Sequence, residues 1–316
     1  MRKAFVLAVC MAVMVSVGLL AQDAMDLDTA LSFFANDQVM VEFSEAGQAQ
    51  LEQIIAAFKT ALGVPEGLDD TDAGSGEEDV GALEIDLSLK HVVNKLSQAY
   101  YTLANVFLTT DDYFPTAEYL AGKHWGFKSL RMNPGFNDLS GGRFDDSVAQ
   151  ETDVRAMYWT NSNWLRASTQ DKMGAIFGGV PAKAEMLMSR IVELDTVFIY
   201  GGVYRSLGGY YEQLPGLFGR DMNKALFNLC HLVDEPQYCT DCSEGEVGEM
   251  VANAYEYLEN QTFFVEHYLI PEKHWEDAAR ILQNVLDSDI GEDAPLMNAY
   301  AKAHAQKLLE EVNEHL

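Results

Sequence analysis

Basic residues are scarce in this sequence. Only 21 of its 316 residues are Lys or Arg, against 49 Asp and Glu, and the formal net charge is −28. A surface this acidic repels phosphate backbones and anionic lipid headgroups. The composition therefore predicts no nucleic-acid partner and no electrostatic docking to a membrane. Solubility is the simpler explanation of the charge, and docking to an electropositive protein surface is the alternative.

The sequence also lacks the signatures of common enzymes. Gly-x-Ser-x-Gly, Walker A and Rossmann patterns are absent, and none of the seven histidines falls in a metal-protease motif. With 49 carboxylates in the chain, neighbouring acidic residues do not by themselves indicate acid–base catalysis. Glu266-His267 is interpreted as an exposed pair on a helix. We therefore expect neither an enzyme nor a cofactor.

Strand-like alternation of apolar and polar residues is missing as well. Apolar residues instead recur at steps of three and four, as on one face of a helix. A hydrophobic content of 48% excludes a mainly disordered chain. The pattern predicts helices over residues 26–36, 48–62, 87–108, 153–168, 182–194, 203–214, 221–232, 245–258, 261–270 and 271–286, one between Pro115 and Asn133, and a last one from Pro295.

The stretch over residues 182–225 predicts how these helices connect. Its first helix ends at Asp195, and Gly201-Gly202 gives the backbone freedom to reverse. A second, tyrosine-rich segment follows, and Asp221 is then placed as the N-cap of a third helix. Repeated helix–turn–helix units are typical of an α-solenoid, in which no unit buries its apolar face alone.

An acidic segment interrupts the helices at about residues 66–84. Its carboxylates are mixed with Gly and Ser, which predicts a solvated loop. Asp70, Asp72 and Gly74 resemble part of a calcium loop, but no glycine falls at the sixth position that such a loop requires. The sequence predicts no metal site here.

The first 21 residues predict export. Arg2 and Lys3 precede an uncharged apolar run that continues to Ala21, as in a signal segment. An uncleaved anchor helix is the alternative, and a lipoprotein site at Cys10 would come too early in the run. We expect residues 1–21 to be an export signal or anchor and residues 22–316 to form a single helical domain. The expected location is periplasmic or exported, with membrane anchoring through the N-terminal segment as the alternative.

The order of several motifs resembles a known family. The RIVELD sequence (190–195), the Gly201-Gly202 turn, an aromatic segment closed by Pro215, and a Gly-x-Asp step at 219–221 follow one another as in the TatT family. These proteins are the T components associated with bacterial TRAP transporters. The resemblance covers roughly residues 26–316.

That resemblance implies a fold and a role. The fold would be an all-α, TPR-like α-solenoid of stacked helical hairpins. The protein would bind or relay a small apolar ligand together with a TRAP-type solute-binding protein, without chemistry, and would form a homo-oligomer such as a trimer. A generic TPR-like adaptor that holds a peptide in the periplasm is the alternative function.

Clustered aromatic residues are the candidate ligand-binding residues. Aromatic residues at helical spacing usually form core, but Tyr and Trp each add one polar atom to an apolar body, which suits a binding cavity. By resemblance, TatT proteins enclose an apolar pore. The pore candidates are Tyr158, Trp159, Trp164, Tyr200, Tyr204, Tyr210 and Tyr211.

Three cysteines lie close together in the second half of the chain. In an exported protein, Cys230, Cys239 and Cys242 predict one disulfide and one free thiol, with the pairing left open. With His231 they could also form a zinc site. However, Cys230 and His231 are adjacent on a helix and diverge by about 100° around its axis. We therefore expect a disulfide and no metal.

Overall fold

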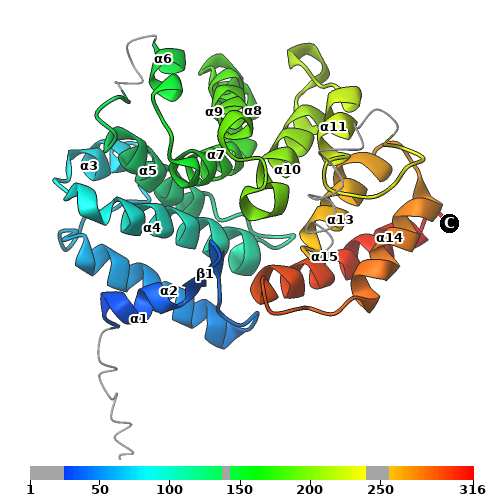
Figure 1. The fold of residues 1–316 in the computed structure, drawn as a ribbon, viewed down its shortest axis with the longest axis horizontal. Coiled ribbons are helices and arrows are strands. Elements are labelled where there is room, and N and C mark those ends of the chain that lie inside the picture. Colours follow the sequence, from blue (N-terminus) through cyan, green and yellow to red (C-terminus); the bar gives the residue numbers. More distant parts are fainter. Residues whose placement is uncertain (1–24, 137–142, 240–255) are drawn as a thin grey trace, which may run out of the picture.

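The computed structural model describes residues 25–136, 143–239 and 256–316. Their regular secondary structure is almost entirely helical (Figure 1), which confirms the predicted all-α class. The helices are α1 (Leu27–Ser32), α2 (Glu45–Ala61), α3 (Gly76–Ala82), α4 (Lys90–Thr102), α5 (Thr116–Arg131), α6 (Phe144–Ala149), α7 (Val154–Ser168), α8 (Lys172–Phe177), α9 (Val180–Leu194), α10 (Phe198–Gln213), α11 (Met222–Leu229), α13 (Glu259–Phe264), α14 (Trp275–Asp287) and α15 (Pro295–Asn313). Two antiparallel strands of two residues each, β1 (Phe34–Ala35) and β2 (Gln38–Val39), form the one β-sheet in the described ranges.

Consecutive helices pack in pairs and form a curved array (Figure 1). Helix α5 packs between α4 and α7, α10 packs on α11, and α14 packs on α15. The last helix then returns to the first half of the chain. The ring of Tyr300 on α15 lies 6.2 Å from that of Phe43, and Lys307 forms an ion pair with Asp111. The array therefore closes around a central space.

Aspartate side chains cap the starts of α7 and α11, as expected for this residue type. Asp221 caps α11 by accepting hydrogen bonds from the backbone N–H groups of Asn223 and Lys224, which confirms the predicted N-cap. Asp153 caps α7 in the same way, by accepting from Arg155 and Ala156. These side chains satisfy backbone donors that lack a partner within the helix.

Glycine sets the close packing of α5 on α7. A Cβ on Gly126 would lie 2.7 Å from the Cα of Thr160, and one on Gly122 would lie 2.2 Å from Oδ1 of Asn163. Neither contact leaves room for a side chain. The absence of a side chain at Gly122 and Gly126 therefore lets these two backbones approach.

The acidic segment differs from the predicted solvated loop. Residues 76–82 form α3, and Asp70 is only 3% exposed. Its carboxylate accepts hydrogen bonds from Lys59 Nζ at 2.9 Å, Tyr100 Oη at 2.8 Å and Trp125 Nε1 at 2.8 Å. These three donors replace the hydrogen bonds to water that the carboxylate loses on burial. Asp70 can therefore be buried although it lies in an acidic run.

The chain reverses slightly earlier than Gly201-Gly202 suggested. Ile199, Tyr200 and Gly201 all have left-handed backbone angles, with φ of 48°, 53° and 77°. A β-branched residue rarely adopts this conformation. Arg205 holds it in place, because its Nη2 donates to the Ile199 carbonyl at 2.9 Å and its Nη1 to the Tyr200 carbonyl at 3.2 Å.

Some predictions fall outside the described residues. They are the N-terminal segment over 1–21, Cys242 and most of the expected helix over 245–258. Within the described ranges, no helix is both long enough and apolar enough to cross a membrane.

Candidate functional site

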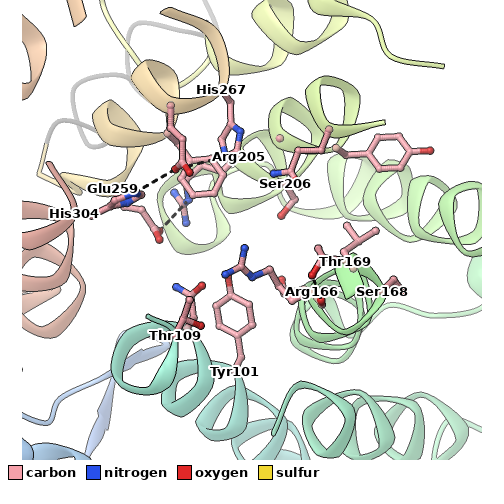
Figure 2. A pocket seen from close by; sticks show the side chains of 18 of the residues that line it. Tyr101, Thr109, Arg166, Ser168, Thr169, Arg205, Ser206, Glu259, His267 and His304 are labelled. Atoms are coloured by element: carbon pink, nitrogen blue, oxygen red, sulfur yellow. Dashed lines mark hydrogen bonds and ion pairs between the residues drawn. The ribbon is translucent and has the colours of Figure 1, made fainter. Parts of the chain in front are cut away.

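A cavity of about 490 Å³ lies in the middle of the array (Figure 2). Helices α7, α8, α9, α10 and α15 line it, together with the ends of α4 and α13. Its walls thus come from both halves of the chain, and its size is typical of small-molecule sites.

Two π-helical segments face this cavity. One is Leu103–Leu108, which continues α4, and the other is Val265–Leu269, which continues α13. The first contributes Asn105 and Val106 to the cavity wall, and the second contributes Glu266 and His267. Single π turns inside α-helices are uncommon and occur frequently at functional sites. Both of these turns border the same space.

One part of the wall is apolar. Phe43, Val106, Leu165, Ile176 and Phe263 all line the cavity. They come from the segment before α2, the π turn after α4, and helices α7, α8 and α13. Such a wall favours the apolar body of a ligand, because burial removes both surfaces from water.

Another part carries charges. Arg205 Nε lies 3.3 Å from Glu259 Oε2, and both side chains are buried. Glu266 Oε2 lies 3.8 Å from His267 Nε2 and 3.7 Å from His304 Nε2. Figure 2 shows Arg205, Glu259, His267 and His304 along one side of the space. The sequence prediction that Glu266-His267 is exposed was wrong for the histidine, which is 6% exposed.

Arg166 reaches the cavity from α7. Its Nε donates to Tyr119 Oη at 3.2 Å, and its guanidinium lies 5.4 Å from the ring centroids of Phe114 and Tyr119. Burial opposes the charge, but the oxygens of Tyr119 and Tyr101 outweigh it and raise the pKa of Arg166. The side chain is therefore a permanent cation.

Two tyrosines in the wall are held neutral. Burial, followed by the charge of Glu259, raises the pKa of Tyr101 and that of Tyr300 well above the ordinary value. Each thus keeps its hydroxyl proton and can donate a hydrogen bond to a bound molecule.

A second, smaller cavity of about 50 Å³ adjoins the first. The two share Tyr101, Arg205, Ser206, Glu259 and Phe263 as wall residues. Gln38 also lines the small cavity, and its buried Nε2 has no hydrogen-bond partner in the described part of the chain. An unpaired buried donor is costly, so this small space suits a water molecule or a polar ligand atom.

The predicted aromatic residues divide into three groups. Tyr210 lines the main cavity, and Tyr158 and Trp159 line the small one. The other four line neither. Trp164 makes a ring contact with Phe127, Tyr200 with Tyr257, and Tyr204 with His231. The hydroxyl of Tyr211 donates a hydrogen bond to Glu185.

The sequence predictions missed the charged wall. Arg166, Arg205 and Glu259 lie within strongly apolar or aromatic stretches, where a charge needs a partner or a function. That mismatch was visible in the sequence, although the meeting of these residues was not.

Cys230 and Cys239 form a disulfide, with their Cα atoms 5.3 Å apart. It follows α11 and is separate from the cavity wall. No cluster of three or more His, Cys, Asp or Glu side chains is arranged to hold a metal ion within the described ranges.

Comparison with known proteins supports the resemblance. No curated protein matches the chain. Residues 88–234 match the family described as "TAtT: TRAP transporter T-component". The matched region runs from α4 through α11 and includes Arg166, Arg205 and Tyr210 of the main cavity. Over residues 88–234, which are less than half of the chain, the sequence is therefore similar to the TRAP transporter T-component family.

Proposed function

We propose that this protein binds a small molecule in the main cavity and relays it to or from a TRAP-type solute-binding protein. The observation that carries the proposal is the 490 Å³ cavity, whose wall includes residues of the family region. The helices after that region complete the wall, since Glu259, His267 and Tyr300 come from α13, its π turn and α15.

The mechanism is binding without chemistry. The apolar wall excludes water from the body of the ligand, and the neutral tyrosines and the charged groups position its polar atoms. Tyr210, Tyr158 and Trp159 act as aromatic contacts in this proposal. The acidic exterior docks an electropositive surface of the partner, which speeds encounter.

The protein acts outside the cytoplasm, on this proposal. Residues 1–21 direct export or anchor the chain, and residues 22–316 form one domain. The Cys230–Cys239 disulfide supports this location, because disulfides persist mainly in oxidising compartments.

Native mass spectrometry tests the proposal directly. The chain from residue 22 onward is measured alone and with the TRAP-type solute-binding protein of the same genome. We expect a complex at micromolar concentrations, ligand mass retained by one of the two proteins, and a homo-oligomer of the chain alone. Absence of any complex under these conditions would overturn the transport role. Binding of extended peptides without a cavity ligand would favour the peptide-adaptor alternative.

A variant that fills the cavity sharpens this test. A Cβ on Gly209 would lie 3.5 Å from His267 Nε2 and 3.6 Å from Phe263 Cε1, which is ordinary contact at the cavity wall. Gly209→Leu is therefore expected to remove the retained ligand mass while the complex with the partner survives. Gly81→Leu, on the short helix α3 away from the cavity, is the control that leaves both unchanged.

A further inference from the structure

Arg166 differs from the other arginines of the described residues because it has no carboxylate within ion-pair distance. Each of the others lies within ion-pair distance of a carboxylate. The pairs are Arg131 with Glu77, Arg143 with Asp146, Arg155 with Asp37, Arg190 with Glu193, Arg205 with Glu259, Arg220 with Glu212, and Arg280 with Glu235. No described carboxylate lies within this distance of Arg166. The chain has 49 acidic residues for 21 basic ones, so the exception does not come from a shortage of partners.

The position of Arg166 is well defined. Its Nε donates a hydrogen bond to Tyr119 Oη, and its guanidinium lies by the rings of Phe114 and Tyr119. Thr169 Oγ1 donates to the carbonyl of Arg166 at 2.8 Å. Figure 2 shows the side chain extending from α7 into the open space beside Tyr101, toward the side that carries Arg205 and Glu259. Among the described residues, the two terminal nitrogens of the guanidinium form no hydrogen bond, so they remain available to a ligand.

The carboxylates that line the cavity are already engaged. Glu259 pairs with Arg205, and Asp111 pairs with Lys307. Glu266 lies between the two histidines. A partly buried cation without a counter-ion is costly, and an anion from outside the chain would remove that cost.

We propose that Arg166 binds the anionic head group of an amphipathic ligand, whose apolar body lies along the Val106, Leu165 and Phe263 wall. A planar guanidinium can donate two parallel hydrogen bonds to a carboxylate or to a phosphate. This inference rests on the proposed binding function and specifies the ligand class. It also changes the expected ligand from purely apolar to amphipathic.

Isothermal titration calorimetry with matched probes tests the inference. Octanoate, octyl phosphate, 1-octanol and octylamine share one apolar chain and differ in head group. For the delipidated chain from residue 22 onward, we expect an anionic probe to bind at least about tenfold more tightly than 1-octanol, and octylamine to bind most weakly. Whichever of octanoate and octyl phosphate binds more tightly identifies the head group of the ligand as a carboxylate or a phosphate.

Two variants assign the effect to Arg166. Arg166→Gln should remove the preference for the anion, a loss of about 10- to 100-fold, while the affinity for 1-octanol stays unchanged. Arg166→Lys keeps the charge without the planar pair of donors and should lose less. Arg143→Gln, in an exposed ion pair at the start of α6, is the control that keeps the full preference.

Several results would overturn the inference. They are equal affinity for octanoate, octyl phosphate and 1-octanol, no binding of any probe, or an anion preference that survives in Arg166→Gln. If Arg166→Gln does not fold, as judged by circular dichroism, the wild-type comparison and Arg166→Lys decide. A complex with the solute-binding partner would still form in each case if the proposed function holds, so the two failures are distinguishable.

Discussion

Arg205 and Glu259 form an ion pair inside the helical array, at 3.3 Å and with side-chain exposures of 3% and 9%. The same arginine donates to the carbonyls of Ile199 and Tyr200, in the left-handed segment where the chain reverses. Both residues line the main cavity and the small one. A single buried pair thus joins the turn of α10 to α13 and forms part of the wall that the cavities share.

Removing one partner of this pair should be strongly destabilising. Glu259→Gln leaves the Arg205 charge buried without a counter-ion, and we expect the free energy of unfolding to fall by about 3–5 kcal/mol. Urea unfolding followed by circular dichroism measures this change. Glu193→Gln is the matched control, because Glu193 pairs with Arg190 but is 64% exposed. Its effect should stay below about 1 kcal/mol. Equal effects of the two substitutions would contradict a structural role for the buried pair.

Asp70 provides a second test, in a segment that looked like a solvated loop. Asp70→Asn replaces an acceptor-only carboxylate with an amide whose nitrogen must face Trp125 Nε1, Tyr100 Oη or Lys59. Because the indole N–H and the ammonium can only donate, at least one hydrogen bond is lost, and Lys59 loses its counter-ion. We expect a loss of about 2–3 kcal/mol in thermal or urea unfolding.

Asp69→Asn is the control for this prediction. Asp69 is exposed, and within the described residues its carboxylate accepts hydrogen bonds only from Thr71 in its own turn. Its substitution should change the free energy of unfolding by less than about 0.5 kcal/mol. If the two variants unfold at the same urea concentration, the carboxylate of Asp70 does not anchor this segment.

Local sequence signals were enough to predict most of the helices. The N-cap at Asp221 and the close approach permitted by Gly122 and Gly126 depend on residue type at one position and its near neighbours. Local sequence signals gave the wrong prediction for Asp70, which is buried and not solvated. Its burial depends on donors from Lys59, Tyr100 and Trp125, which come from three different helices. Composition alone described the acidic run as solvated.

The cavity was harder to predict for the same reason. Tyr210 belongs to it, but Tyr204, six residues earlier on α10, stacks on His231 instead. Which of the two side chains faces the space depends on how α10 packs on α11, a contact that no local pattern specifies. Arg166 and Glu259 are 93 positions apart in the numbering, and no spacing rule connects them. The one sequence signal for these two residues is the placement of a charge within an aromatic stretch.

The close packing of α5 on α7 predicts opposite results for two glycine substitutions. Gly126→Ala puts a Cβ 2.7 Å from the Thr160 Cα, so one helix must shift. We expect the free energy of unfolding to fall by about 1–3 kcal/mol. Gly81→Ala on α3 meets its nearest atom, Arg131 Nη1, at 3.5 Å. There the better helix propensity of alanine should leave stability unchanged or raise it by up to about 1 kcal/mol. Urea unfolding compares the two, and a stabilising Gly126→Ala would contradict the packing described above.

The buried tyrosines predict a loss of stability at alkaline pH. Burial raises the pKa of Tyr100, Tyr158 and Tyr257 above the ordinary value of 10.0. The folded state therefore keeps these phenolic protons when the unfolded chain releases them. Their contribution is fully present below about pH 10 and declines as pH rises toward the folded pKa, by about 1.4 kcal/mol per pH unit for each such tyrosine. Urea unfolding over a pH series from neutral to alkaline measures the decline.

Tyrosinate absorbance of the folded protein provides an independent reading of the same effect. Of the 14 tyrosines, the exposed ones should ionise near the ordinary pKa, and the buried ones only as the protein unfolds. Tyr158→Phe removes one raised phenol and should reduce the alkaline slope by about 1.4 kcal/mol per pH unit. Tyr113→Phe, at an exposed position, should leave the slope unchanged. If all tyrosines instead ionised together near pH 10 while helical circular dichroism persisted, the burial of these hydroxyls, and with it the neutral wall of the cavity, would be wrong.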